Sequence, residues 1–216
     1  MQQDGYSIAV LISGSGSTLR NLLELERDGR LRAHVAGVVA SRDCAGLEHA
    51  REFSVPWTIV ERGKPFDAQK FSARVTAALA PWRPRLVVFG GFLSMYLPPA
   101  EYAGRVLNIH PALLPAFGGP GMYGDRVHEA VLRSGVKLTG CSVHLVDAEY
   151  DHGAILAQRA VPVLEGDDAH SLGERVRAVE RELYPTVINW FATGRIIVGS
   201  GGKVTVSGRD LRQLPL

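Results

Sequence analysis

The chain has few cysteines and no long apolar run. Only Cys44 and Cys141 occur among its 216 residues, which excludes a disulfide framework and favours a reducing compartment. The apolar, uncharged run 86–100 is shorter than the ~20 apolar residues of a spanning helix, and glycine and proline interrupt it. Residues 1–7 lack the basic and apolar stretches of a secretion signal. We therefore expect a cytoplasmic protein without a membrane partner.

Charge excess, metal-ligand spacing and two common catalytic motifs are also missing. The 24 basic and 22 acidic residues leave a net charge of +2 without a Lys/Arg cluster, so nucleic acid is not an expected partner. The seven histidines and two cysteines show no HxxxH or CxxC spacing, so no metal is expected. A Gly-Lys-Ser/Thr loop and a GxSxG elbow are absent, which argues against a Walker NTPase and a serine hydrolase. We therefore expect the partners to be small-molecule substrates. The protein is expected to be a monomer or a homodimer.

The first half of the chain alternates between strand-like and helix-like segments. Short β-branched runs predict buried strands, and leucines, valines and aromatics at helical spacing predict the helices between them. Buried strands joined by helices indicate an α/β fold with a doubly wound, mostly parallel twisted sheet. The expected strands are 8–12, 35–40, 57–60, 86–89 and 106–109, and the expected helices cover 19–29, 47–53 and 71–79.

The second half changes character, because its strands are long and adjacent. Residues 136–146 predict a strand with a bulge at Gly140, and 154–163 predict its antiparallel hairpin partner across a turn at 151–153. Helices are expected around 127–131 and over 172–183, and short strands at 196–198 and 204–206. We expect a single domain, 1–216, with an N-terminal half of about 1–105 and a C-terminal half of about 106–216.

A Gly-Ser loop, Ser13–Thr18, joins the first expected strand to the first expected helix. Backbone N–H groups at a helix N-terminus bind anions, and glycines allow a phosphate to approach closely. The dinucleotide fingerprint fits poorly, because Leu19 stands where its third glycine would fall. The loop therefore predicts a phosphate monoester site, and an ordinary strand–helix turn is the alternative.

Asn108, His110 and Asp151 are the candidate catalytic residues. Asn108 and His110 alternate at the end of a strand, so their side chains share one side of the sheet at the edge where ligands bind. An amide can stabilise an oxyanion and an imidazole can move protons near neutral pH, which suits acyl transfer. Asp151, at the expected turn, could charge or orient a histidine. Each could also be purely structural.

These motifs together resemble the 10-formyltetrahydrofolate-dependent formyltransferases. The resemblance covers residues 8 to about 195, and an Asn-x-His-Pro pattern with a distal Asp is specific to that superfamily. The glycine-serine loop directly after the first strand resembles that of the superfamily branch that acts on glycinamide ribonucleotide. The matching residues are Leu11–Ser17, Gly91–Leu93, Asn108–Pro115, Ser142–His144 and Asp151.

The resemblance implies a formyltransferase fold with a Rossmann-like, phosphate-binding N-terminal half and a catalytic, folate-binding C-terminal half. It implies that the formyl group of 10-formyltetrahydrofolate is transferred to the amine of a phosphoribosylglycinamide in purine biosynthesis. Asn108 and His110 would bind the formyl oxygen, and Asp151 would raise the pKa of His110. The phosphoribosyl contacts would be Gly16, Ser17, Thr18, Arg177 and Glu180, and the folate contacts Gln69, Leu93, Ser94, Met95, Tyr96, Asn108, Asp147 and Asp151.

Some residues depart from the family pattern. Gln69 stands where an Arg near the folate is common, and His152 follows Asp151 where Gly is usual. His152 would either perturb the pKa of Asp151 or point to solvent. Two other functions remain open: a formyltetrahydrofolate deformylase, which would carry an additional N-terminal domain, and a non-catalytic phosphate-binding module that uses only the Gly-Ser loop. A methionyl-tRNA formyltransferase would need a longer C-terminal part than follows about residue 196.

Overall fold

The computed structural model describes residues 5–199 and 204–207. These residues fall into two compact units, which divide between Leu107 and Asn108 and are described separately. Residues 1–4, on which part of the expectation about a secretion signal rests, lie outside the described residues. Helices within the described ranges are all too short or too polar to cross a membrane.

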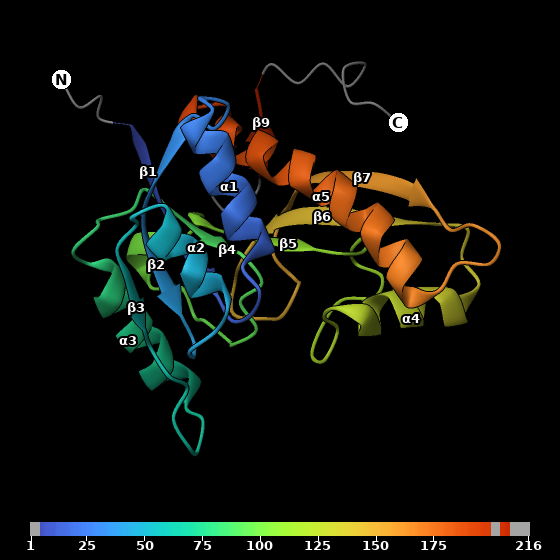
Figure 1. Ribbon diagram of the computed structural model, residues 1–216, viewed down its shortest axis with the longest axis horizontal. Helices are drawn as coiled ribbons and strands as arrows, with labels where there is room; N and C mark the ends of the chain where they lie inside the picture. Colours follow the sequence, from blue (N-terminus) through green and yellow to red (C-terminus); the bar gives the residue numbers. More distant parts are fainter. Residues whose placement is uncertain (1–4, 200–203, 208–216) are drawn as a thin grey trace. The chain divides into compact units, whose positions relative to one another are not determined.

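The first unit is built on parallel strands. The order β3-β2-β1-β4 places β1 between β2 and β4, and Ile8–Ile12 of that strand are fully buried, as a continuous apolar run predicts. Helices connect successive strands (Figure 1). The elements are β1 (Tyr6–Ile12), α1 (Ser17–Arg27), β2 (Ala33–Ala40), α2 (Gly46–Glu52), β3 (Trp57–Ile59), α3 (Ala68–Leu79), β4 (Leu86–Phe89) and the 3₁₀ turn η1 (Ala100–Tyr102).

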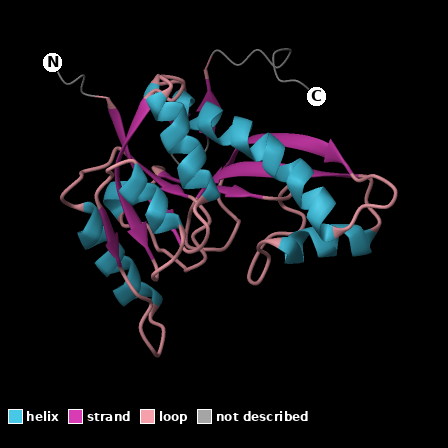
Figure 2. Cartoon of the chain, in the orientation of Figure 1, coloured by secondary structure: helices cyan, strands magenta, loops and turns pink. Residues whose placement is uncertain are grey.

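The second unit consists mainly of long antiparallel strands and one long helix. Strands β6 and β7 pair antiparallel, and α5 packs on both of them and on α4 (Figures 1 and 2). A capping box at Asp168 and Ser171 starts α5, whose apolar face is buried. The elements are β5 (Val106–His110), whose first two residues belong to the first unit, α4 (Asp125–Ser134), β6 (Leu138–Leu145), β7 (Ile155–Pro162), α5 (Ala169–Ala192), β8 (Ile196–Val198) and β9 (Val204–Val206).

The expected fold class is confirmed. The main sheet has seven strands in the order β3-β2-β1-β4-β5-β6-β7, with β1 to β5 parallel where their pairing is described, and β8 and β9 form a separate antiparallel pair. The expected bulge at Gly140 is wrong, because the register shift in this hairpin falls between Val143 and His144. Gly140 is needed for a different reason: a Cβ there would lie 1.9 Å from the carbonyl oxygen of Arg159.

Candidate active site

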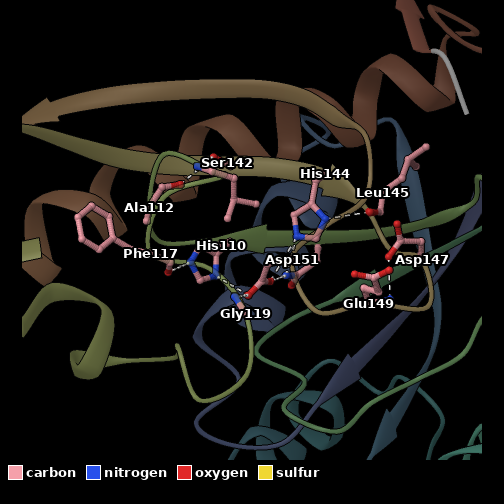
Figure 3. Close-up of polar contacts among 12 residues, drawn as sticks. His110, Ala112, Phe117, Gly119, Ser142, His144, Leu145, Asp147, Glu149 and Asp151 are labelled. Atoms are coloured by element: carbon pink, nitrogen blue, oxygen red, sulfur yellow. Dashed lines mark hydrogen bonds and ion pairs between the residues drawn. The ribbon is translucent and has the colours of Figure 1, made fainter. Parts of the chain in front are cut away.

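Three predicted residues meet in the second unit. Strand β5 ends at His110, and its period of two places the side chains of Asn108 and His110 on one side. Asp151 comes from the turn between β6 and β7, and Figure 3 shows its carboxylate next to the His110 ring. The side chain of His110 is 3% exposed and that of Asp151 is 10% exposed. The predicted triad is therefore a polar cluster in which His110 and Asp151 are nearly buried and Asn108 is half-buried.

Asp151 is the centre of this cluster. Its Oδ1 accepts a hydrogen bond from Asn108 Nδ2 at 3.3 Å, and its Oδ2 accepts one from the Gly119 N–H at 2.9 Å. Oδ2 also lies 3.4 Å from His110 Nδ1. The backbone of Asp151 is left-handed, with φ of 53°, a conformation that Asp tolerates better than most residues and that costs free energy. The surrounding contacts hold it there.

His110 has distinct partners at its two ring nitrogens. A carbonyl oxygen can only accept, so Nε2 must carry a proton to make its 2.8 Å bond to the Phe117 carbonyl (Figure 3). The neutral ring therefore presents a bare Nδ1 to Asp151. A second proton on Nδ1 would convert the 3.4 Å contact into an ion pair. This nitrogen is the one at which the ring can gain and lose a proton.

Burial and charge act in opposite directions on both groups. Burial lowers the pKa of His110, and the Asp151 carboxylate and the Phe117 carbonyl raise it without restoring its usual value. Burial raises the pKa of Asp151, but the His144 contact, the His110 charge and the Gly119 N–H together bring it below its usual value. Asp151 is thus ionised near neutral pH and His110 is largely neutral.

Sequence reasoning missed the contributions of His144, Phe117 and Gly119. His144, on β6, is 2% exposed and bonds the Leu145 carbonyl through Nδ1 and the Asn108 amide through Nε2. Its spacing of two from the buried Ser142 places both side chains on one side of β6, a signal that was available in the sequence. Phe117 and Gly119 act through backbone atoms, which no side-chain pattern reveals.

The loop after His110 is anchored to β6 and β7. Ser142 Oγ donates to the Ala112 carbonyl at 2.7 Å and accepts from the Leu114 N–H at 2.9 Å. Gln158 Nε2 donates to Ser142 Oγ at 2.8 Å and to the Leu114 carbonyl at 2.9 Å. At the end of this loop, a Cβ at Gly118 would lie 3.2 Å from Asp151 Cβ. The anchored loop therefore lies directly against Asp151, whose Oδ2 accepts a hydrogen bond from the Gly119 N–H.

The predicted phosphoribosyl contacts of the second unit lie on α5. Arg177 donates to Glu174 Oε1 through Nε at 3.0 Å and Nη2 at 2.5 Å. Burial raises the pKa of Glu180 to about 7, against the lowering effect of Arg177 and Arg181. Arg177 is thus close enough to act on the carboxyl group of Glu180, and the ligand contacts of both residues stay predictions.

The Gly-Ser loop lies in the first unit. Gly16 is the N-cap of α1 in a left-handed conformation, with φ of 71°, and it has no side chain with which to cap the first N–H groups. A Cβ on Gly16 would lie 2.6 Å from Gly46 Cα, so only glycine allows the two backbones to approach this closely. Ser17 and Thr18 open the helix. Uncapped N–H groups beside two hydroxyls suit a phosphate.

The predicted folate contacts of the first unit differ in exposure. Leu93 is 43% exposed and Met95 is half-buried, whereas Ser94 and Tyr96 are buried. Burial raises the pKa of Tyr96 to about 12, and its hydroxyl lies 3.0 Å from Thr76 Oγ1. The buried side chains of Ser94 and Tyr96 do not support direct side-chain contacts with folate, and these two contacts stay predictions. Gln69 is exposed in the first turn of α3.

Asp147 and His152 form an exposed pair near the catalytic aspartate. His152 Nδ1 lies 2.9 Å from Asp147 Oδ2, and Asp147 Oδ1 accepts from the Glu149 N–H at 2.9 Å. Asp147 raises the pKa of His152. The imidazole beside Asp151 in sequence thus pairs with Asp147 at the surface. In residues 5–199 and 204–207 no group of three or more His, Cys, Asp or Glu is arranged to hold a metal ion.

Comparison with known proteins identifies the family of this chain. A model of the formyl transferase family matches residues 6–188. The chain belongs to the formyl transferase family. It is 44% identical to the phosphoribosylglycinamide formyltransferase of Mycobacterium tuberculosis, over 92% of this chain and 93% of that protein. It is 35% identical to the chloroplastic phosphoribosylglycinamide formyltransferase of Vigna unguiculata, over 94% of this chain and 66% of that protein.

Solved structures of the family have the same fold. Glycinamide ribonucleotide transformylase 1 of Symbiobacterium toebii superposes with a TM-score of 0.83 at 38% identity, over 95% of both chains. A formyltetrahydrofolate deformylase of Pseudomonas syringae superposes with a TM-score of 0.81 at 25% identity, over 94% of this chain and 66% of that one. The fold alone therefore does not separate the two activities, whereas sequence identity favours the first.

Proposed function

We propose that this protein transfers the formyl group of 10-formyltetrahydrofolate to the amine of N1-(5-phosphoribosyl)glycinamide, a step of purine biosynthesis. The observation that carries the proposal is the buried cluster of Asn108, His110 and Asp151 at the end of β5. Membership of the formyl transferase family and 44% identity to a phosphoribosylglycinamide formyltransferase support it. The reaction needs no metal, and its partners are two small molecules in the cytoplasm.

The cluster suits direct attack of an amine on the formyl carbon. A C–N bond forms, the carbonyl electron pair moves to oxygen, and the resulting tetrahedral oxyanion is stabilised by the Asn108 amide and by His110 once it is protonated. The proton released by the amine passes through His110 Nδ1, beside the ionised Asp151, to N10 of the folate. The bond from the formyl carbon to N10 then breaks, which releases the formylated amine and tetrahydrofolate.

The acceptor distinguishes this function from that of a deformylase, in which water replaces the amine. The uncapped N–H groups at Gly16–Thr18 suit the substrate phosphate, and Glu180 suits the ribose hydroxyls. The proposed folate contacts are Gln69, Leu93–Tyr96, Asn108, Asp147 and Asp151. A module that only bound phosphate would not require a buried Asn–His–Asp cluster, which is costly to desolvate.

Turnover tests the proposal directly. The protein is mixed with 10-formyltetrahydrofolate and phosphoribosylglycinamide, and tetrahydrofolate release is followed by absorbance. We expect turnover that depends on the amine. The Asn108→Ala variant should lose roughly 10²-fold in kcat, because one oxyanion donor contributes about 3 kcal/mol to lowering the barrier. Folded protein without turnover would refute the proposal, and equal turnover without the amine would identify a deformylase.

A further inference from the structure

His144 connects the backbone of β6 to the catalytic amide. Its Nδ1 lies 2.8 Å from the Leu145 carbonyl oxygen, which can only accept, so Nδ1 carries a proton (Figure 3). In the neutral ring, Nε2 is then an acceptor. Two groups face Nε2: Asn108 Nδ2 at 3.0 Å and, beyond hydrogen-bonding distance, Asp151 Oδ1 at 3.6 Å. The Leu145 carbonyl thus selects the tautomer that accepts a hydrogen bond from Asn108.

Two acceptors determine which end of the Asn108 amide enters the cluster. Nδ2 lies 3.0 Å from His144 Nε2 and 3.3 Å from Asp151 Oδ1, and each of its two hydrogens has one partner. A rotation of 180° would place the amide oxygen against a carboxylate oxygen and an imidazole lone pair. That orientation loses both hydrogen bonds and adds repulsion, so the amino end faces inward.

We infer that His144 is a positioning residue for formyl transfer, which holds the Asn108 amino group in the orientation that the oxyanion needs. The inference rests on the proposed function. When the formyl oxygen binds, it displaces the longer bond to Asp151, and the shorter bond to His144 keeps the other hydrogen in place. An amide that is oriented beforehand does not have to reorganise during the reaction.

A purely structural role would use the other ring nitrogen. The bond from Nδ1 to the Leu145 carbonyl joins two neighbouring residues of β6, next to the register shift between Val143 and His144. Such a role depends on Nδ1 and is indifferent to Nε2. The two nitrogens of His144 therefore separate the two interpretations.

Two variants with amide side chains separate the contact made by Nδ1 from the contact made by Nε2. In His144→Asn the short side chain reaches the position of Nδ1, so the bond to the Leu145 carbonyl is kept and the contact with Asn108 is lost. In His144→Gln the longer side chain places an acceptor oxygen near the position of Nε2. We expect kcat of H144N to fall at least tenfold with little change in KM, and H144Q to recover most of that loss. An H144N variant as fast as H144Q, or faster, would overturn the inference.

A double-mutant cycle tests the coupling to the amide. If His144 acts through Asn108, adding H144N to Asn108→Ala should lower kcat by less than twofold further. A tenfold further loss would show that His144 acts by another route. Circular dichroism and denaturant unfolding of each variant report whether the fold is kept.

A measurement without turnover separates this inference from the proposed function. Long-range ¹H–¹⁵N spectra of the wild-type imidazoles at pH 7.5 report the tautomer of His144. We expect a protonated Nδ1 and an unprotonated Nε2, and a proton on Nε2 would refute the inference even in an active enzyme. A wild-type protein that shows the expected tautomer but no formyl transfer would refute the proposed function alone.

Discussion

Gly118→Ala should disturb the catalytic aspartate, although it replaces no catalytic residue. The added Cβ would lie 2.6 Å from Leu114 Cδ2 and 3.2 Å from Asp151 Cβ, whereas ordinary contacts lie between 3.4 and 4 Å. Leu114 is 5% exposed and has little space into which to move. The loop and Asp151 must therefore separate by several tenths of an ångström, which stretches the 2.9 Å bond from the Gly119 N–H to Asp151.

The expected magnitude follows from this displacement. A displacement of about 1 Å at a catalytic group can cost 10²-fold in rate, so the smaller shift here should lower kcat roughly tenfold. Overpacking by one methyl group should lower the free energy of unfolding by roughly 1–3 kcal/mol. KM should change much less than kcat, because Asp151 acts on His110 during the reaction.

Gly29→Ala is the matched control. Gly29 follows α1 with φ of 70°, and a Cβ added there would meet nothing within 4 Å, so alanine should cost about 1 kcal/mol of stability through backbone strain alone. Steady-state kinetics and urea unfolding of both variants decide the question. A kcat of Gly118→Ala within twofold of wild type, or an equal kcat loss in Gly29→Ala, would refute the reasoning.

Three further predictions concern charge and packing. Since the Asp151 carboxylate raises the pKa of His110, Asp151→Asn should move the His110 limb of the kcat/KM profile to lower pH, and an unmoved limb would remove that role. Burial raises the pKa of Glu180 to about 7 in the folded state, so the wild type loses stability as pH rises from about 4 through 7. The free energy of unfolding of Glu180→Gln should therefore exceed that of wild type by roughly 2–3 kcal/mol at pH 8.5 and by little at pH 4, as measured by urea unfolding at both pH values. Gly37→Ala places a Cβ 2.2 Å from the Trp82 ring and should cost about 3 kcal/mol or more, and an unchanged melting temperature would contradict this packing.

Much of the fold could be predicted from local patterns. The continuous apolar runs at 8–12 and 86–89 and the helical spacing of Leu19, Leu22 and Leu23 are local properties, and the structure confirms these elements. Strand ends shifted by a few residues, because hydrogen bonds to neighbouring strands decide where a strand stops. The register shift beside His144 was not predictable, since it depends on how β6 and β7 pair.

The sequence by itself determined the residue types and the strand-end spacing of the candidate site, because a period of two places Asn108 and His110 on one side wherever the strand lies. Only the tertiary structure decided what surrounds them. Asp151 comes from a distant turn, His144 from another strand, and the Phe117 carbonyl and Gly119 N–H from backbone that every residue possesses. Tautomers and pKa directions depend on such contacts, so they emerge only when the chain is folded.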